Sequence, residues 1–305
     1  MPVLLFSFDS LWDTVKEFLA PVIAFLTKAL IAGFPFINAF FILAIGIWGA
    51  SLYGKPQPYT RKLLLRCLGI AVILFGISQL WDAWFVLEEG KLETDGSMLA
   101  VISVLIGWLF GEALMMDKAL GWLGISLTRL FAAKPTPAEI AKAKKNEPSP
   151  ELLAAEKRRL QDTADGFTIA TTLCGFSSLL FTGYLEGRDM NQALPLLIML
   201  AFDGALVFIL SVAYGGGVAF AAIPTLLVQL LVWLVDAKWG DILTATLVGQ
   251  LSIVGAIILL CGGICLALGK RFRAANLIPA LFIPVIFTLA VDKVTEAVEE
   301  QIDKK

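Results

Sequence analysis

The chain contains no histidine and few charged residues, and both features limit the classes of protein to which it can belong. None of its 305 residues is histidine, and only 16% are charged, whereas soluble domains carry about a quarter. Without imidazole, the chain lacks the side chain that most often serves as a general acid or base and as a metal ligand. With 58% hydrophobic residues and a mean hydropathy of +0.82, the composition indicates a membrane protein rather than a soluble one.

Motifs for soluble chemistry are absent as well. The sequence has neither a glycine-rich phosphate loop with its lysine nor a GxSxG nucleophile turn. Its four cysteines all fall in apolar segments, and the two that share a helical face, Cys261 and Cys265, make a poor metal site without further soft ligands. A net charge of −2 gives no general affinity for polyanions. We therefore expect no enzyme, no metal or other cofactor, and no nucleic-acid partner.

Long apolar runs dominate the sequence instead. A helix needs about 20 mostly apolar residues to cross a hydrocarbon core of about 30 Å. Because backbone groups in lipid must pair within their own segment, these runs predict an all-α polytopic bundle in contact with the lipid bilayer. Eight spans are expected, at residues 37–54, 62–84, 97–115, 167–184, 193–213, 217–235, 243–269 and 276–292.

The N-terminal 36 residues are harder to assign. Residues 18–36 are apolar but carry Lys28 and Pro21, so that they could span as a ninth helix, re-enter the membrane or lie flat on it. The first residues lack the basic region of a signal peptide. We treat residues 1–36 as a separate amphipathic, re-entrant or transmembrane segment and expect it to be retained.

The positions of lysine and arginine predict the orientation. Of 24 such residues, 16 fall on one predicted side of the membrane and six on the other. Cytoplasmic loops carry the excess. The charged segment 128–166, with helix starts at Thr136 and Ser149, is therefore expected to be a cytoplasmic linker in a bacterial inner-membrane protein, with the tail 293–305 on the outer side. The linker divides the membrane region into halves at 37–127 and 167–292.

A short stretch of similar sequence occurs in both membrane halves. LGIAVILFG at 68–76 is similar to VGAIILLCG at 254–262, with glycines seven residues apart in both. The first copy is expected to run outward and the second inward, so that a repeat would be inverted. Inverted repeats recur in secondary transporters, whose sites lie near the midplane where the repeats meet.

Several segments resemble one bacterial family. GFTIATTLCGFSSLLFTGYLEG (166–187), DGALVFILSVAYGGGVAFAAIPTLLVQ (203–229) and RAANLIPAL (273–281) are, in order and spacing, similar to members of the membrane protein family called domain of unknown function 554. The resemblance covers about residues 37–290 and implies a multi-span inner-membrane protein without an established activity. Two departures stand out: the N-terminal extension, and Gln250 where the resemblance implies an acidic residue.

Asp203 is the most informative single residue. It lies near the middle of LLIMLAFDGALVFILS, residues 196–211. An ionised aspartate at a helix centre costs about 2.5–3.5 kcal/mol on insertion scales, so it should face a polar interior. Polar side chains in neighbouring spans could converge on it, and the candidate ion- or substrate-binding residues are Asp203, Ser177, Ser178, Gln229, Gln250, Ser252 and Asn276.

Other interpretations of these residues stay open. Serines commonly serve helix packing, Glu112 is expected at the interface, and Asn276 could cap the last helix. Three functions remain. The first is a transporter or channel-like protein for a small solute or ion, in which Asp203 attracts a cation or titrates; the second is a membrane scaffold, with a homo-oligomer as one form. An intramembrane enzyme that uses aspartates is a distant third, because the sequence offers no second carboxylate near the expected midplane.

Overall fold

The apolar runs form helices throughout the part of the chain that the structure describes. A computed structural model describes residues 8–88, 91–93, 97–131, 150–186, 193–240, 243–270 and 273–291. The elements in order are α1 (Phe8–Ala50), α2 (Pro58–Trp84), β1 (Val86–Glu88), β2 (Lys91–Glu93), α3 (Ser97–Ala113), α4 (Met116–Phe131), α6 (Pro150–Gly175), η1 (Leu180–Glu186), α8 (Ala193–Tyr214), η2 (Gly216–Ala221), α9 (Ala222–Trp239), α10 (Ala245–Leu268) and η4 (Ala274–Leu281). Apart from a hairpin of two three-residue strands, the fold is helical, and the predicted class of all-α polytopic membrane protein is confirmed.

The number of spans differs from the expected eight or nine. Among the described residues, six helices are long and apolar enough to cross a membrane, and a seventh span results if α3 and α4, bent by 56°, count as one. The expected span 167–184 coincides with the second half of α6 and with η1, and the helix is interrupted at Phe176 and Ser177. The expected count is therefore not confirmed.

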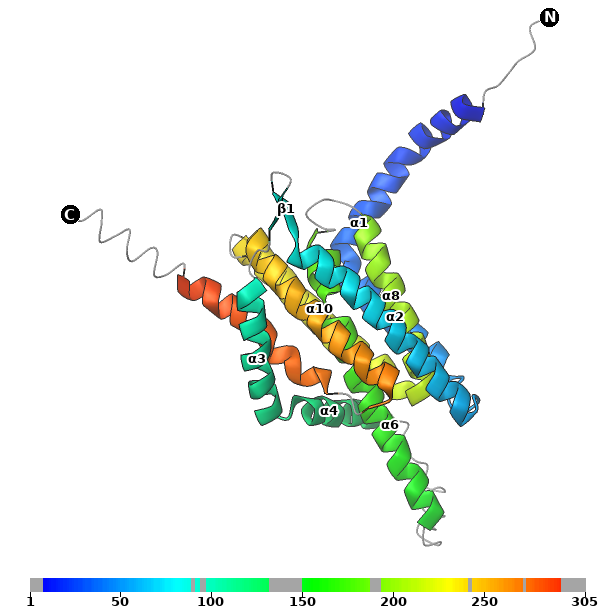
Figure 1. The fold of residues 1–305 in the computed structure, drawn as a ribbon. Helices are drawn as coiled ribbons and strands as arrows, with labels where there is room; N and C mark the ends of the chain where they lie inside the picture. The colour runs from blue at the N-terminus through cyan, green and yellow to red at the C-terminus, as the bar shows by residue number, and fades with distance from the viewer. Residues whose placement is uncertain are drawn as a thin grey trace, which may run out of the picture.

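The ambiguous stretch 18–36 belongs to α1. This helix continues from Phe8 to Ala50 over 43 residues, which corresponds to a length of about 65 Å. Its part long and apolar enough to span is Thr27–Ala50, so stretch 18–36 is not a separate helix. In Figure 1 the N-terminal part of α1, in dark blue, extends well away from the bundle.

Small residues allow the helices to pack closely. α2 and α10 lie side by side and antiparallel (Figure 1), and a Cβ on Gly263 of α10 would lie 2.9 Å from the carbonyl oxygen of Gly69 on α2. In the same way, Gly107 and Gly111 of α3 lie against the backbone of Ala280 and Asn276 in η4. This is the close backbone approach that membrane helices use in place of a hydrophobic driving force.

α6 leads from the charged segment into the core. It begins at Pro150, immediately after the predicted start signal at Ser149, and residues 153–159 are exposed. From about Thr163 onward almost every residue is buried. The boundary expected between linker and membrane half at 166/167 therefore falls inside one continuous helix. The start signal at Thr136 and the tail 293–305 lie outside the described residues.

The turn between α3 and α4 carries local backbone strain. Met115 has a φ of 51° and is the one non-glycine residue with positive φ in the described chain. An L-residue in this left-handed region costs about 1–2 kcal/mol. The turn sets α4 across the end of the bundle, as Figure 1 shows, where α4 contacts α6 and η4.

Candidate functional site

Asp203 lies on α8 and is completely buried. Its side chain is 0% exposed, as is that of Asn38 on α1. Asn38 Nδ2 donates a hydrogen bond to Asp203 Oδ2 at 2.9 Å, between residues 165 positions apart in sequence. The aspartate thus faces the protein interior, as the insertion cost of a carboxylate requires.

Glycines bring α1 and α8 close enough for this bond. Gly204, next to Asp203, lies directly against the ring of Phe41 on α1. Further along the same interface, a Cβ on Gly49 would lie 2.8 Å from the carbonyl oxygen of Phe208 on α8. Because larger side chains would separate the two helices, these glycines place the Asn38 amide within hydrogen-bonding distance of the carboxyl group.

The end of α6 forms the third side of the site. Cys174, also completely buried, lies against the carboxyl group of Asp203, although its thiol does not complete a hydrogen bond to Oδ1. Two residues later the helix is interrupted at Phe176 and Ser177. The break faces α10, because Gly255 lies directly against the backbone of Ser177 and Ser178.

A second irregular helix approaches the same break. The 3-10 turn η2 passes into α9 at Ala222, and a Cβ on Gly175 would lie 3.6 Å from Thr225 Oγ1 in the first turns of α9. Gln229 follows Thr225 by four residues and therefore lies on the same face of α9. Since α6 and α9 run in the same direction, Gln229 is level with the break in α6.

Many polar atoms of this region have no hydrogen-bond partner. Buried side-chain oxygens and nitrogens in native proteins are nearly always paired with protein, water or a ligand. In the described chain the buried atoms without a partner are Asn38 Oδ1, Thr171 Oγ1, Ser177 Oγ, Ser178 Oγ, Asp203 Oδ1, Ser211 Oγ, Thr225 Oγ1, Gln229 Nε2 and Oε1, and Gln250 Oε1. Most are oxygens, and Asp203, Asn38, Ser177, Ser178, Thr225 and Gln229 belong to the helices around the break. Of the unpartnered oxygens, Asn38 Oδ1 belongs to the side chain that bonds the Asp203 carboxyl group, and the others lie on helices that border the break.

The sequence-predicted residues are only partly brought together. Ser177, Ser178 and Gln229 lie at or beside the break in α6. Gln250 is 8% exposed on α10, five residues before Gly255 and thus about 7.5 Å nearer the N-terminal end of that helix. Ser252 bonds within its own helix, to the carbonyl oxygen of Val248 at 2.8 Å. The proposed binding roles of these residues stay predictions.

Asn276 belongs to a different cluster. Its Nδ2 donates to Glu112 Oε2 at 2.6 Å, and its Oδ1 accepts from the backbone N–H of Asp117 at 3.0 Å. The expectation that Asn276 caps its own helix is wrong: it caps the first turn of α4, because the bend after α3 brings that N-terminus against η4. Glu112, which also contacts Arg273 at 3.4 Å, is half-exposed, consistent with an interfacial position.

Asn38, Cys174 and Thr225 were not predicted as site residues. Asn38 had a recognisable signal, because it is the only amide side chain in the apolar run 29–50. Cys174 and Thr225 had none, since their positions depend on where α6 breaks and where α9 begins.

Comparison with known proteins places the chain in a family. The sequence model of the family described as protein of unknown function (DUF554) matches residues 34–289. The chain belongs to this family. As a DUF554 member it is similar to the uncharacterized membrane protein YdfK of Bacillus subtilis (strain 168), with 23% identity covering 83% of this chain and 94% of the relative. It is also similar to the uncharacterized protein YqgA of Escherichia coli (strain K12), with 24% identity covering 84% of this chain and 96% of that protein. No solved structure matches the chain.

The family assignment agrees with the resemblance inferred from the sequence. The match begins at residue 34, so the N-terminal part of α1 lies outside the shared region, as the predicted extension does. Neither relative carries an activity in its name. The established statement is therefore a multi-span membrane protein of a family whose function is unknown.

Proposed function

We propose that this chain is a secondary transporter or channel-like protein for a small solute or ion, with its site around Asp203. The observation that carries the proposal is a fully buried carboxyl group, held by Asn38 on one oxygen and without a partner on the other. A purely structural bond could be made by an asparagine without the cost of burying an ionisable group. A carboxyl group at this depth is better explained by a cation or proton that binds there.

The surrounding atoms favour a particular ligand. Asp203 Oδ1 and Asn38 Oδ1 are hard oxygen donors, of the type that binds protons and alkali or alkaline-earth cations rather than soft metals. A single carboxylate balances a single positive charge. We therefore favour a proton or a monovalent cation, either as the cargo or as the coupling ion for a solute.

Helix irregularity near Asp203 supports the same function. Transporters commonly hold ions and substrates at discontinuous helices near the midplane, where backbone groups are protected from lipid. Here α6 is interrupted two residues after Cys174, and η2 precedes α9 beside Thr225.

The inverted repeat and the orientation belong to the same proposal. The two similar stretches lie on α2 and α10, which pack antiparallel with Gly76 against Leu260. Two elements related by a two-fold axis in the membrane plane would cross in this way. The charge bias supports a cytoplasmic side for α4 and the exposed start of α6 in a bacterial inner membrane.

Flux measurements in proteoliposomes test the proposal. The purified chain is reconstituted with a pH- or Na⁺-sensitive dye inside, and a gradient of protons or Na⁺ is applied with a potential of either sign. We expect wild-type flux that Asp203→Asn abolishes, because the amide keeps a bond to Asn38 but cannot carry the charge. Ser103→Ala is the matched control, since its buried hydroxyl donates to the carbonyl oxygen of Leu99 within α3, and it should keep full flux.

A contrary result would favour the scaffold. If neither ion moves through wild type, or if Asp203→Asn transports normally, the proposed role of the carboxyl group is refuted. Unchanged assembly of that variant in size-exclusion chromatography would then leave a non-transporting scaffold as the better explanation.

A further inference from the structure

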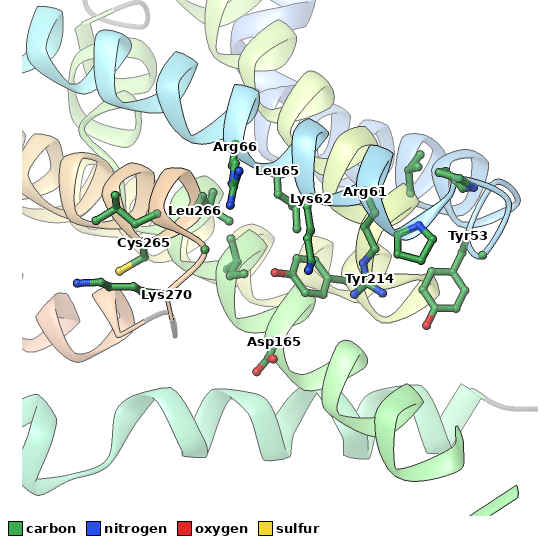
Figure 2. Close-up of a pocket in the computed structure, with 17 residues that line it drawn as sticks. Tyr53, Arg61, Lys62, Leu65, Arg66, Asp165, Tyr214, Cys265, Leu266 and Lys270 are labelled. Atoms are coloured by element: carbon green, nitrogen blue, oxygen red, sulfur yellow. The ribbon is translucent and has the colours of Figure 1, made fainter. Parts of the chain in front are cut away.

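A large cavity lies at one end of the bundle, and the buried carboxyl group of Asp203 does not line it. It has a volume of about 700 Å³ and lies between the start of α2, the middle of α6 and the ends of α8 and α10. Figure 2 shows Arg61, Lys62 and Arg66 extending from α2 toward α6, with the ring of Tyr214 between the helices. The charge bias assigns this end of the bundle to the cytoplasm.

The wall of this cavity is strongly basic. Arg61, Lys62, Arg66 and Lys270 line it, against the single acidic residue Asp165. Arg61 is already engaged: it pairs with Asp162 at 2.9 Å and its guanidinium lies 5.3 Å from the ring centre of Tyr214. The other three cations form no ion pair with any residue that the structure describes. The cavity thus retains uncompensated positive charge.

This clustering is unfavourable for the isolated helix. Lys62 and Arg66 are four residues apart on α2, and like charges at that spacing destabilise a helix by about 0.2–0.5 kcal/mol. Arg61 and Lys62 also lie near the N-terminus of α2, whose first turn contains no acidic residue and where the helix dipole favours anions instead. An anion in the cavity would remove both penalties at once.

We propose that this cavity binds a phosphate group, held by Lys62, Arg66 and Lys270 with Arg61 as a pre-positioned fourth cation. Arginine and lysine are the side chains that most often bind phosphate, through charge-assisted hydrogen bonds. The apolar part of the wall includes Leu65, Leu266 and Leu268, and Leu268 is exposed on the outside of the bundle. The phosphate can therefore come from an anionic lipid headgroup, since basic pockets between spans commonly bind such lipids, or from a free phosphate compound.

Two ligand arms distinguish the sources. In the lipid arm, thermal unfolding of the full chain is measured in nanodiscs of phosphatidylcholine with and without phosphatidylglycerol. In the free-phosphate arm, unfolding in neutral detergent is measured against increasing inorganic phosphate, with sodium chloride of equal ionic strength as reference. Stabilisation by phosphatidylglycerol alone identifies the headgroup. Stabilisation by inorganic phosphate in detergent identifies a free phosphate compound.

Matched variants locate the binding. Lys62→Gln with Arg66→Gln should weaken the apparent affinity at least tenfold, and Lys270→Gln, from a different helix, should weaken it independently. Lys157→Gln with Arg158→Gln removes the same charge from the exposed part of α6 and should leave the affinity unchanged. Size-exclusion profiles show whether each variant is folded, and Lys270→Gln provides the test if the α2 double variant is not.

Three outcomes would overturn the proposal. The first is that neither phosphatidylglycerol nor inorganic phosphate raises the thermal stability of wild type above that of its reference sample. The second is equal stabilisation of wild type and both cavity variants. The third is an equal loss in the cavity and control variants, which would show that surface charge in general, and not the cavity, attracts phosphate. None of these results depends on ion flux at Asp203, so the phosphate site and the proposed transport function can be refuted independently of each other.

Discussion

The hydrogen bond between Asn38 and Asp203 should couple α1 to α8 strongly. The donor and acceptor are 2.9 Å apart and both side chains are fully buried. Bonds between membrane helices average about 0.6 kcal/mol in double-mutant cycles, with a maximum near about 1.7. A bond to a charged group contributes about 1.5–3 kcal/mol and one between neutral groups about 0.5–1.5. For Asn38→Ala and Asp203→Ala we expect a coupling free energy of about 1–1.7 kcal/mol, at the upper end of the membrane range.

Reversible unfolding in mixed micelles measures this coupling. The chain contains eight tryptophans, so fluorescence during a titration with sodium dodecyl sulfate can report the free energy of unfolding of wild type, both single variants and the double variant. Asn38→Ala alone should be the more costly truncation, because it leaves a buried carboxyl group without its donor. The double variant should then be less destabilised than the sum of the two.

A second cycle provides the control. Ser252 bonds only to Val248 in its own helix, so Ser252→Ala and Asp203→Ala should be additive within about 0.3–0.5 kcal/mol. Coupling between Asn38 and Asp203 no larger than in this control would refute the geometry of the site. Coupling above about 1.5 kcal/mol would indicate an ionised carboxylate, since a neutral pair does not reach that value.

Three further predictions concern the frame around the site. Gly111→Ala should cost about 1–3 kcal/mol of unfolding free energy, because α3 lies directly against the backbone of η4 there. Gly249→Ala meets no atom within 4 Å inside α10 and should stabilise by up to about 1 kcal/mol. Met115→Gly should raise thermal stability by up to about 1 kcal/mol, since the left-handed φ of 51° suits glycine and the methionine is half-exposed; a loss of stability would argue against the strained turn. Burial, followed by the hydrogen bond of Tyr53 to Asp162, raises the pKa of Tyr53 above 10.0 in the folded state. This stabilisation is complete below pH 10 and is lost as pH rises through the folded pKa, so wild type should lose more stability than Tyr53→Phe in an alkaline titration.

The helical fold was predictable because lipid leaves the backbone almost no alternative. The breaks in the helices were less so. Pro224 lies in the first turn of α9, where proline is tolerated, and the irregular part is η2 before it. The break at Phe176 and Ser177 contains no proline. Gly175 before it and Ser177 and Ser178 after it are the residue types at which helices bend, but only the structure shows that the break faces α10 at Gly255.

The first contact of the site, between Asp203 and Asn38, could be predicted from sequence, whereas the positions of the other polar residues could not. Asp203 was identifiable because a lone carboxylate in an apolar helix must face a polar interior. The same rule applies to Asn38, the lone amide of the run 29–50, and two isolated polar groups in different spans are natural partners because lipid offers neither of them another. The rule does not rank the remaining candidates, since Gln229 and Gln250 are equally isolated in their helices. Only the register of α6 against α9 and α10 decides that Gln229 lies beside the break and Gln250 nearer the N-terminal end of α10. Pairing lone polar residues across spans is therefore informative for the first contact of a membrane site, and helix register is needed for every contact after it.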